Sequence, residues 1–143
     1  MHRRSISDER GFTMVELLVV VLLLGIIALI ALPSFLGQRP KAHDAEARAM
    51  IRAAQLALRT YETDHDTFNA TRAALEAIEP AIGDASSGFA VSGTATTYRI
   101  TEHSDSGTDF TLERDASGIV TRTCTSPGRG LCRAAPDADG NRW

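Results

Sequence analysis

The sequence predicts an α+β fold in which a long N-terminal hydrophobic helix continues into an amphipathic helix packed on a small antiparallel β-sheet. Three observations predict this fold. Residues 12–32 are almost entirely apolar, and apolar side chains recur every three or four residues over 43–62. Beyond Gly83, β-branched and aromatic residues alternate with polar ones between turn signals.

The composition excludes several classes of protein. The 143 residues include 15 Lys and Arg and 18 Asp and Glu, which gives a formal net charge of −3. Phosphate binding needs clustered positive charge, so we predict no direct nucleic-acid partner. Hydrophobic residues make up 43% of the chain, which is too many for a disordered protein.

The apolar segment has the length of a membrane span. A helix over residues 12–32 rises about 31 Å, close to the thickness of the hydrocarbon core. Three arginines precede it and outweigh two acidic residues, so the positive-inside rule places the body after Pro33 outside the cytoplasm. Two alternatives fit less well. A buried helix of a soluble protein would need other apolar segments around it, and a cleaved signal peptide would need a better small-residue site than IALIALPS.

Glu16 is the one charged residue within this apolar segment. A charge at membrane depth costs about 2.5–3.5 kcal/mol on insertion scales, so it requires a partner or a function. The alternative is that the side chain lies near the helix end and reaches the membrane surface.

Residues 11–32, GFTMVELLVVVLLLGIIALIAL, resemble the N-terminus of type IV pilins and pseudopilins, and the resemblance continues through residues 33–61. It implies that residues 1–11 are a leader, which prepilin peptidase cuts between Gly11 and Phe12. The same enzyme would then methylate the α-amino group of Phe12. The family's invariant glutamate, fifth after the cut, matches Glu16. Two acidic residues at positions 8 and 9 depart from the usual basic leader.

The resemblance and elementary electrostatics together suggest what Glu16 does. Cleavage would expose an α-amino group with a pKa of about 8 on Phe12, four residues before Glu16. The carboxylate can neutralise that amine on its own helix or on a neighbouring one. Desolvation offsets much of the attraction, so the pair would set the register between helices more than it adds stability.

The body is expected to begin with the amphipathic helix over 43–62. Its apolar stripe would face the sheet, and Asp44 and Arg48 would form an i,i+4 ion pair. Residues 63–69 read as a loop, and Thr71 would cap a short helix that runs through Ile78 and is stopped by Pro80. The stripe consists of Ala47, Ile51, Ala54, Leu58 and Tyr61.

The sheet is expected to be an antiparallel meander. Alternation predicts strands over 98–101, 110–113 and 119–123, with 89–91 as a candidate fourth strand. Turn signals at 104–107 and 115–118 separate the last three strands. One face of the sheet would cover the helix and the other would face water or a neighbour.

Cys124 and Cys132 enclose the turn sequence TSPGRGL. Outside the cytoplasm we expect them to form a disulfide, whereas a metal site would need more ligands than His103 can add. A C-terminal disulfide loop is also common in type IV pilins.

Asp137 and Asp139 lie in DADGN, which is similar to a calcium loop of some pseudopilins. The alternative is a solvated acidic turn, and no other cofactor is predicted.

The resemblance divides the chain into a leader (1–11), a transmembrane and filament-core helix (12–37) and an extracytoplasmic globular domain (38–143). The predicted function is that of a type IV pilus subunit, processed by prepilin peptidase and polymerised through its N-terminal helix into a helical homo-oligomer at the cell surface. It would lie in the inner membrane before the assembly machinery acts on it. The alternatives are a pseudopilin of a type II secretion system and an unprocessed single-pass anchor that displays a binding domain. No catalytic motif is visible, so we predict no enzyme.

Overall fold

The computed structural model describes residues 11–143, and for Ile30 and residues 32–36 it describes the backbone alone. The predicted leader, apart from Gly11, therefore lies outside the described residues. The chain divides into two units, Met1–Gly37 and Gln38–Trp143. The described part of the first unit contains one helix, α1 (Met14–Leu36).

The second unit begins with helix α2 (Arg39–His65), which is longer than the sequence predicts. Gly37 and Gln38 form a turn before it, and a proline occupies its first turn, where no backbone N–H is needed. Residues 63–65, expected in a loop, are helical. The Thr63 hydroxyl donates to the carbonyl of Arg59 at 3.0 Å within this last turn. Asp66 then ends the helix in a left-handed conformation with φ 54°.

Two short helices follow α2. Thr71 caps α3 (Arg72–Ile78) as predicted, its hydroxyl accepting from the N–H of Ala74 at 3.2 Å. A 3₁₀ helix, η1 (Pro80–Asp84), comes next and was not predicted. Its position depends on long-range contacts of Arg72. That guanidinium donates to the carbonyls of Ile82, Gly83, Ala85 and Ser86.

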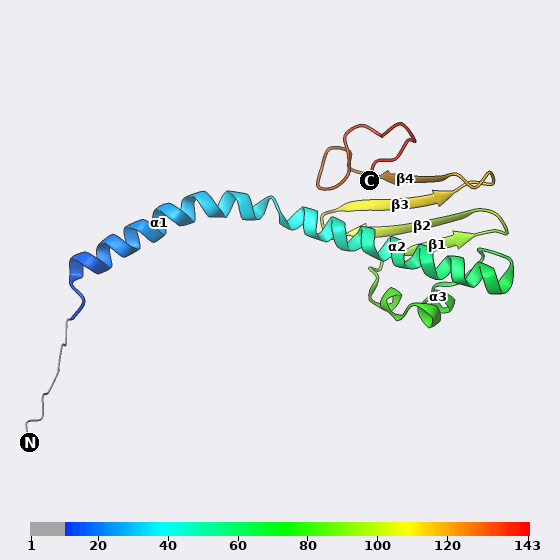
Figure 1. Ribbon diagram of the computed structural model, residues 1–143, viewed down its shortest axis with the longest axis horizontal. Coiled ribbons are helices and arrows are strands. Elements are labelled where there is room, and N and C mark those ends of the chain that lie inside the picture. Colours follow the sequence, from blue (N-terminus) through cyan, green and yellow to red (C-terminus); the bar gives the residue numbers. More distant parts are fainter. Residues whose placement is uncertain (1–10) are drawn as a thin grey trace, which may run out of the picture. The chain divides into compact units, whose positions relative to one another are not determined.

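The sheet is a four-stranded antiparallel meander in the order β1-β2-β3-β4, and α2 covers one of its faces (Figure 1). This confirms the predicted meander, including the fourth strand. The α+β class with helices packed on an antiparallel sheet is thus confirmed. The strands are β1 (Ala90–Gly93), β2 (Tyr98–Ser104), β3 (Thr108–Arg114) and β4 (Val120–Cys124).

The core lies between α2 and the sheet. Alternate residues of β2 and β3 are buried against the helix, and the predicted apolar stripe of α2 meets them, with Tyr61 half-buried. The opposite face of the sheet carries cross-strand polar pairs. Arg99 and Glu113 form an ion pair at 2.9 Å there, and the hydroxyls of Thr101 and Thr111 lie 3.2 Å apart. The fully buried apolar side chains are Ile51, Ala54, Leu58, Leu75, Ile82, Ile100, Phe110 and Leu112.

Asp44 does not form the predicted ion pair with Arg48. Its carboxylate is fully buried and accepts from the hydroxyl of Ser104 at 2.7 Å, from the hydroxyl of Ser106 and from the backbone N–H of Leu131 at 2.8 Å. A buried carboxylate needs several donors, and these come from the β2–β3 turn and the disulfide loop. Asp44 therefore ties the start of α2 to two distant segments.

A disulfide joins Cys124 at the end of β4 to Cys132, whose side chain is buried. The loop between them presses closely on Asp44. A Cβ atom added to Gly130, which has φ +56°, would lie 1.9 Å from Oδ2 of Asp44. The loop therefore requires glycine at this position.

We expect Gly130→Ala to lower the free energy of unfolding by about 2–4 kcal/mol, because it combines left-handed backbone strain with a clash against a buried carboxylate. Gly128→Ala is the matched control, since Gly128 has φ +83° and its Cβ would meet only the Ala134 methyl at 3.6 Å. It should cost about 1–2 kcal/mol. Urea unfolding followed by fluorescence of the single tryptophan measures both. Equal losses would mean that the contact with Asp44 contributes nothing.

Residues 141–143 run along the outer edge of β4. The side-chain oxygen of Asn141 accepts from the N–H of Arg122 at 2.9 Å, and the N–H of Arg142 donates to the carbonyl of Arg122 at 2.7 Å. The indole of Trp143 is buried, lies edge-on to Phe110 and donates to a β4 carbonyl. These contacts attach the segment to the body.

Candidate functional site

Helix α1 is apolar on every side, as its sequence requires. From Phe12 to Leu29, the large apolar side chains are between 47% and 90% exposed in the isolated chain. A helix with no polar stripe is stable only among other apolar groups, which lipid or neighbouring helices supply. Taken over the described residues, no helix of the structure is long and apolar enough to cross a membrane.

The start of α1 is built by a reciprocal pair, Thr13 and Glu16. The Thr13 hydroxyl accepts from the N–H of Glu16 at 3.2 Å, and Oε2 of Glu16 accepts from the hydroxyl of Thr13 at 3.1 Å and from its N–H at 3.3 Å. This is a capping box, which satisfies two backbone N–H groups that the first turn leaves unpaired. The carboxylate is thereby held at the beginning of the helix.

The peptide bond between Gly11 and Phe12 lies just before this cap. Both residues are outside the helix, the Phe12 side chain is 83% exposed, and no atom lies within 4 Å of a Cβ built on Gly11. A peptidase needs backbone that is extended and open to approach, and glycine permits the closest approach. The three predicted residues of this segment, Gly11, Phe12 and Glu16, are neighbours in sequence and lie at the exposed start of α1.

Thr13 is the residue of this site that the sequence analysis missed. The spacing of Thr13 and Glu16, a threonine followed three residues later by a glutamate before an apolar run, is the ordinary sequence signal of a capping box. Glu16 therefore has a structural partner within its own chain.

We expect Thr13→Val to loosen the first turn of α1, because it removes the hydroxyl that caps Glu16. The loss of an N-cap costs about 1 kcal/mol, so amide hydrogen exchange in residues 14–17 should accelerate about fivefold in detergent micelles. Thr13→Ser keeps the hydroxyl and should exchange at the wild-type rate. Identical exchange in the Val and Ser variants would show that the capping box does not stabilise the helix start.

The other predicted sites lie in the second unit. The Cys124–Cys132 disulfide follows β4. His103 pairs with Asp109, its ring Nδ1 lying 2.6 Å from Asp109 Oδ1. The Oδ1 atom of Asp137 accepts hydrogen bonds from the backbone N–H groups of Asp139 and Asn141 in the same turn. No three His, Cys, Asp or Glu residues within 11–143 are grouped so that they could hold a metal ion. Calcium at Asp137 and Asp139 stays a prediction.

Comparison with known proteins identifies the N-terminal segment. Residues 6–32 match the family model described as the prokaryotic N-terminal methylation motif. Type II secretion system core protein G of Escherichia coli (strain K12) is 32% identical over 75 residues, which cover 52% of this chain and 52% of that protein.

Two relatives have other names. Type IV major pilin protein PilA of Myxococcus xanthus is 33% identical over 61 residues, covering 43% of this chain and 28% of that protein. Competence protein ComGC of Halalkalibacterium halodurans is 33% identical over 64 residues, covering 45% and 63%. The chain spans about half the length of the core protein G relatives that it matches. The motif and the relatives agree: the N-terminal half of the chain carries the prokaryotic N-terminal methylation motif and is similar to pilin-like proteins, among them a type II secretion core protein G and a type IV pilin.

Proposed function

We propose that this chain is a structural subunit that polymerises through α1 after its leader is removed between Gly11 and Phe12. The observation that carries the proposal is helix α1 itself. Its side chains are apolar on all sides, and Thr13 and Glu16 cap its first turn shortly after the exposed Gly11. Such a helix needs an apolar partner along its whole length. Other copies of the same helix provide one.

In this proposal Glu16 decides how neighbouring helices align. Removal of the leader gives Phe12 a free α-amino group, which the peptidase then methylates. That cation would lie among apolar side chains, and a carboxylate is the group that can neutralise it. Side-by-side packing has no hydrophobic gain over lipid, so van der Waals packing and this charge pair direct assembly. We also propose that α1 holds the subunit at the membrane before assembly.

The first candidate filament is the pseudopilus of a type II secretion system. The relatives named core protein G support it, with 32–36% identity over about half of the chain. The second candidate is a type IV pilus. The similarity to PilA and the disulfide loop between Cys124 and Cys132 favour it. In both cases the body after Gln38 forms the filament's outer surface, and no catalytic step is involved.

Intact mass and N-terminal fragmentation of the protein in two cell fractions test this function. A chain that starts at methylated Phe12 is expected in sheared surface filaments if the filament is a pilus, and only in the membrane fraction if it is a pseudopilus. A chain that retains its leader, or one that starts beyond Leu32, would contradict the proposal. Retention of the leader would support the unprocessed single-pass anchor instead.

A further inference from the structure

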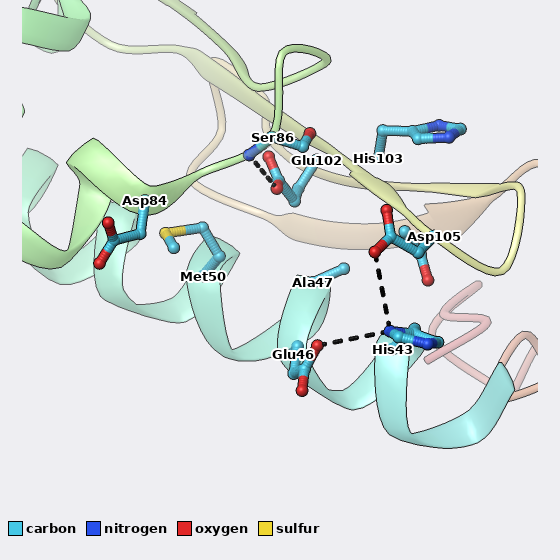
Figure 2. Close-up of a pocket in the computed structure, with 10 residues that line it drawn as sticks. His43, Glu46, Ala47, Met50, Asp84, Ser86, Glu102, His103 and Asp105 are labelled. Atoms are coloured by element: carbon cyan, nitrogen blue, oxygen red, sulfur yellow. Dashed lines mark hydrogen bonds and ion pairs between the residues drawn. The ribbon is translucent and has the colours of Figure 1, made fainter. Parts of the chain in front are cut away.

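The body contains a hollow of about 240 Å³ between the start of α2, the end of η1 and the loop end of β2 (Figure 2). Four carboxylates line it, and we call this hollow the acidic pocket. Glu46 comes from α2, Asp84 from η1, Glu102 from β2 and Asp105 from the turn after β2. Their convergence from four segments concentrates negative charge in one concave site.

Glu102 is the deepest of these groups and is incompletely paired. Its side chain is 4% exposed, and its Oε1 accepts from the N–H of Ser86 at 2.8 Å. Its Oε2 is buried without a hydrogen-bond partner among the described residues. A buried carboxylate oxygen with no donor is unfavourable, and a water molecule or a cationic ligand in the pocket would supply the missing donor.

The rim of the acidic pocket is open and also negative. The Glu46 and Asp105 side chains are 78% and 80% exposed, and the imidazole of His43 lies between them, 3.6 Å and 3.8 Å from their carboxylates (Figure 2). Ala47 and Met50 add an apolar wall beside the carboxylates. A ligand that fits must combine a cationic head with an apolar stem.

An arginine side chain has these properties. Its planar guanidinium carries five N–H donors and can form two parallel hydrogen bonds to the two oxygens of one carboxylate. Its methylene stem can pack against Ala47 and Met50. A divalent metal fits less well, because within residues 11–143 no three acidic or histidine side chains are grouped closely enough to hold one. The pocket therefore selects for an organic cation.

The same chain presents arginines on the opposite flank of α2. Arg48 and Arg52 each follow a pocket-lining residue of α2 by two positions, which places them about 200° around the helix. Arg48 lies 5.5 Å from the ring centroid of Trp143, and burial lowers its pKa, with Arg52, Arg133 and Arg122 adding to this effect. Gly130 of the disulfide loop lines a hollow together with Arg48. We call Arg48, Arg52 and Arg129, the residue before Gly130, the basic flank. The exposed guanidinium of Arg129 forms no hydrogen bond or ion pair with other described residues.

We propose that the acidic pocket of one copy receives the guanidinium of Arg129 from the disulfide loop of a neighbouring copy. This proposal rests on the proposed function, since it assigns the contact between bodies in the filament. The acidic pocket and the disulfide loop are different patches of the same body, so the contact is heterologous. Repeated contacts of this kind build an open helical array rather than a closed dimer.

Photo-cross-linking of the full-length protein in its own cells tests the contact. A benzophenone amino acid replaces Pro127, an exposed residue of the same loop, so that Arg129 remains in place. We expect a cross-linked dimer whose second site maps to residues 43–50 or 102–105. Arg129→Glu should reduce this dimer at least about tenfold, because like charges then face each other at the pocket.

Charge reversal on the pocket side completes the test. Glu46→Arg alone should also reduce the dimer about tenfold, and Glu46→Arg combined with Arg129→Glu should restore it. Both positions are exposed, so neither change disturbs the core. Arg59→Glu, on the exposed side of α2, is the matched control and should leave the dimer unchanged.

The outcomes separate this contact from the proposed function. If the wild-type chain retains its leader or forms no filament, the proposed function fails, and a pocket-mapped dimer sensitive to Arg129→Glu still supports the contact. If processed filaments form but the cross-link maps outside the pocket, reaches a different protein, or is insensitive to charge reversal, the contact is overturned. Failure of the double reversal to restore the dimer would also overturn it.

Discussion

Glu16→Ala is expected to reduce the amount of assembled filament about a hundredfold while leader removal continues, because the α-ammonium group at Phe12 then enters an apolar environment without a counter-charge. The variant also loses the capping box with Thr13. Quantification of the protein in sheared and membrane fractions measures assembly. The N-terminal mass of the membrane-held chain shows whether cleavage after Gly11 continues.

Glu16→Gln separates charge from capping. The amide keeps an oxygen that can accept from Thr13, but it carries no charge. We expect Glu16→Gln to assemble as poorly as Glu16→Ala, and Thr13→Val, which keeps the charge, to assemble far better than either. Normal assembly of Glu16→Gln would mean that Glu16 acts through the helix cap alone. Normal assembly of Glu16→Ala would contradict any assembly role for this residue.

Asp44→Ala is expected to lower the free energy of unfolding of the body by about 3–5 kcal/mol, because it leaves three donors around a buried carboxylate without an acceptor. These donors are the hydroxyls of Ser104 and Ser106 and the N–H of Leu131. The variant would loosen the start of α2, the β2–β3 turn and the disulfide loop together. Urea unfolding of the full chain in micelles, followed by Trp143 fluorescence, measures the loss.

Asp44→Asn provides the matched control for this prediction. The amide oxygen can still accept from Leu131, and the amide N–H₂ can donate to the serine hydroxyls, which reverse their direction. We therefore expect a loss below about 1.5 kcal/mol. Asp64→Ala, an exposed carboxylate near the other end of α2, should change stability by less than about 0.5 kcal/mol. If Asp44→Ala behaves like Asp64→Ala, the buried hydrogen bonds do not stabilise the body.

The secondary structure could be predicted from the sequence wherever its cause is local. The stripe from Ala47 to Leu58 follows the helical period, and alternation over 98–101 and 110–113 follows the strand period, so both give a correct element. The cap of α3 is also a local signal, and Thr71 was found. The 3₁₀ helix η1 could not be predicted in this way, because the contacts to its carbonyls at Ile82 and Gly83 come from Arg72, about ten residues earlier.

The functional residues, too, could be predicted only where they lie close together in sequence. Gly11, Phe12 and Glu16 are adjacent in sequence, so their motif is visible there. For Asp44 the sequence predicts only a local ion pair with Arg48, because its actual donors lie 60 to 87 residues away and only folding brings them together. The acidic pocket was missed for the same reason. The residues of β2 alternate in direction, and the sequence shows Glu102 as one polar residue among many rather than as the buried end of a pocket.

The pairing of residues 141–143 with β4 bears on how this protein avoids aggregation. An uncovered strand edge is a template to which unfolded segments of other chains can add. Here Asn141 and Arg142 occupy the N–H and carbonyl of Arg122 on the outer edge of β4, so strand addition at that position is blocked. In the proposed function, many copies of the chain gather at a membrane before they assemble, and each is then exposed to this hazard. The covered edge would suppress disordered growth between sheets and leave the proposed ordered growth to the apolar helices.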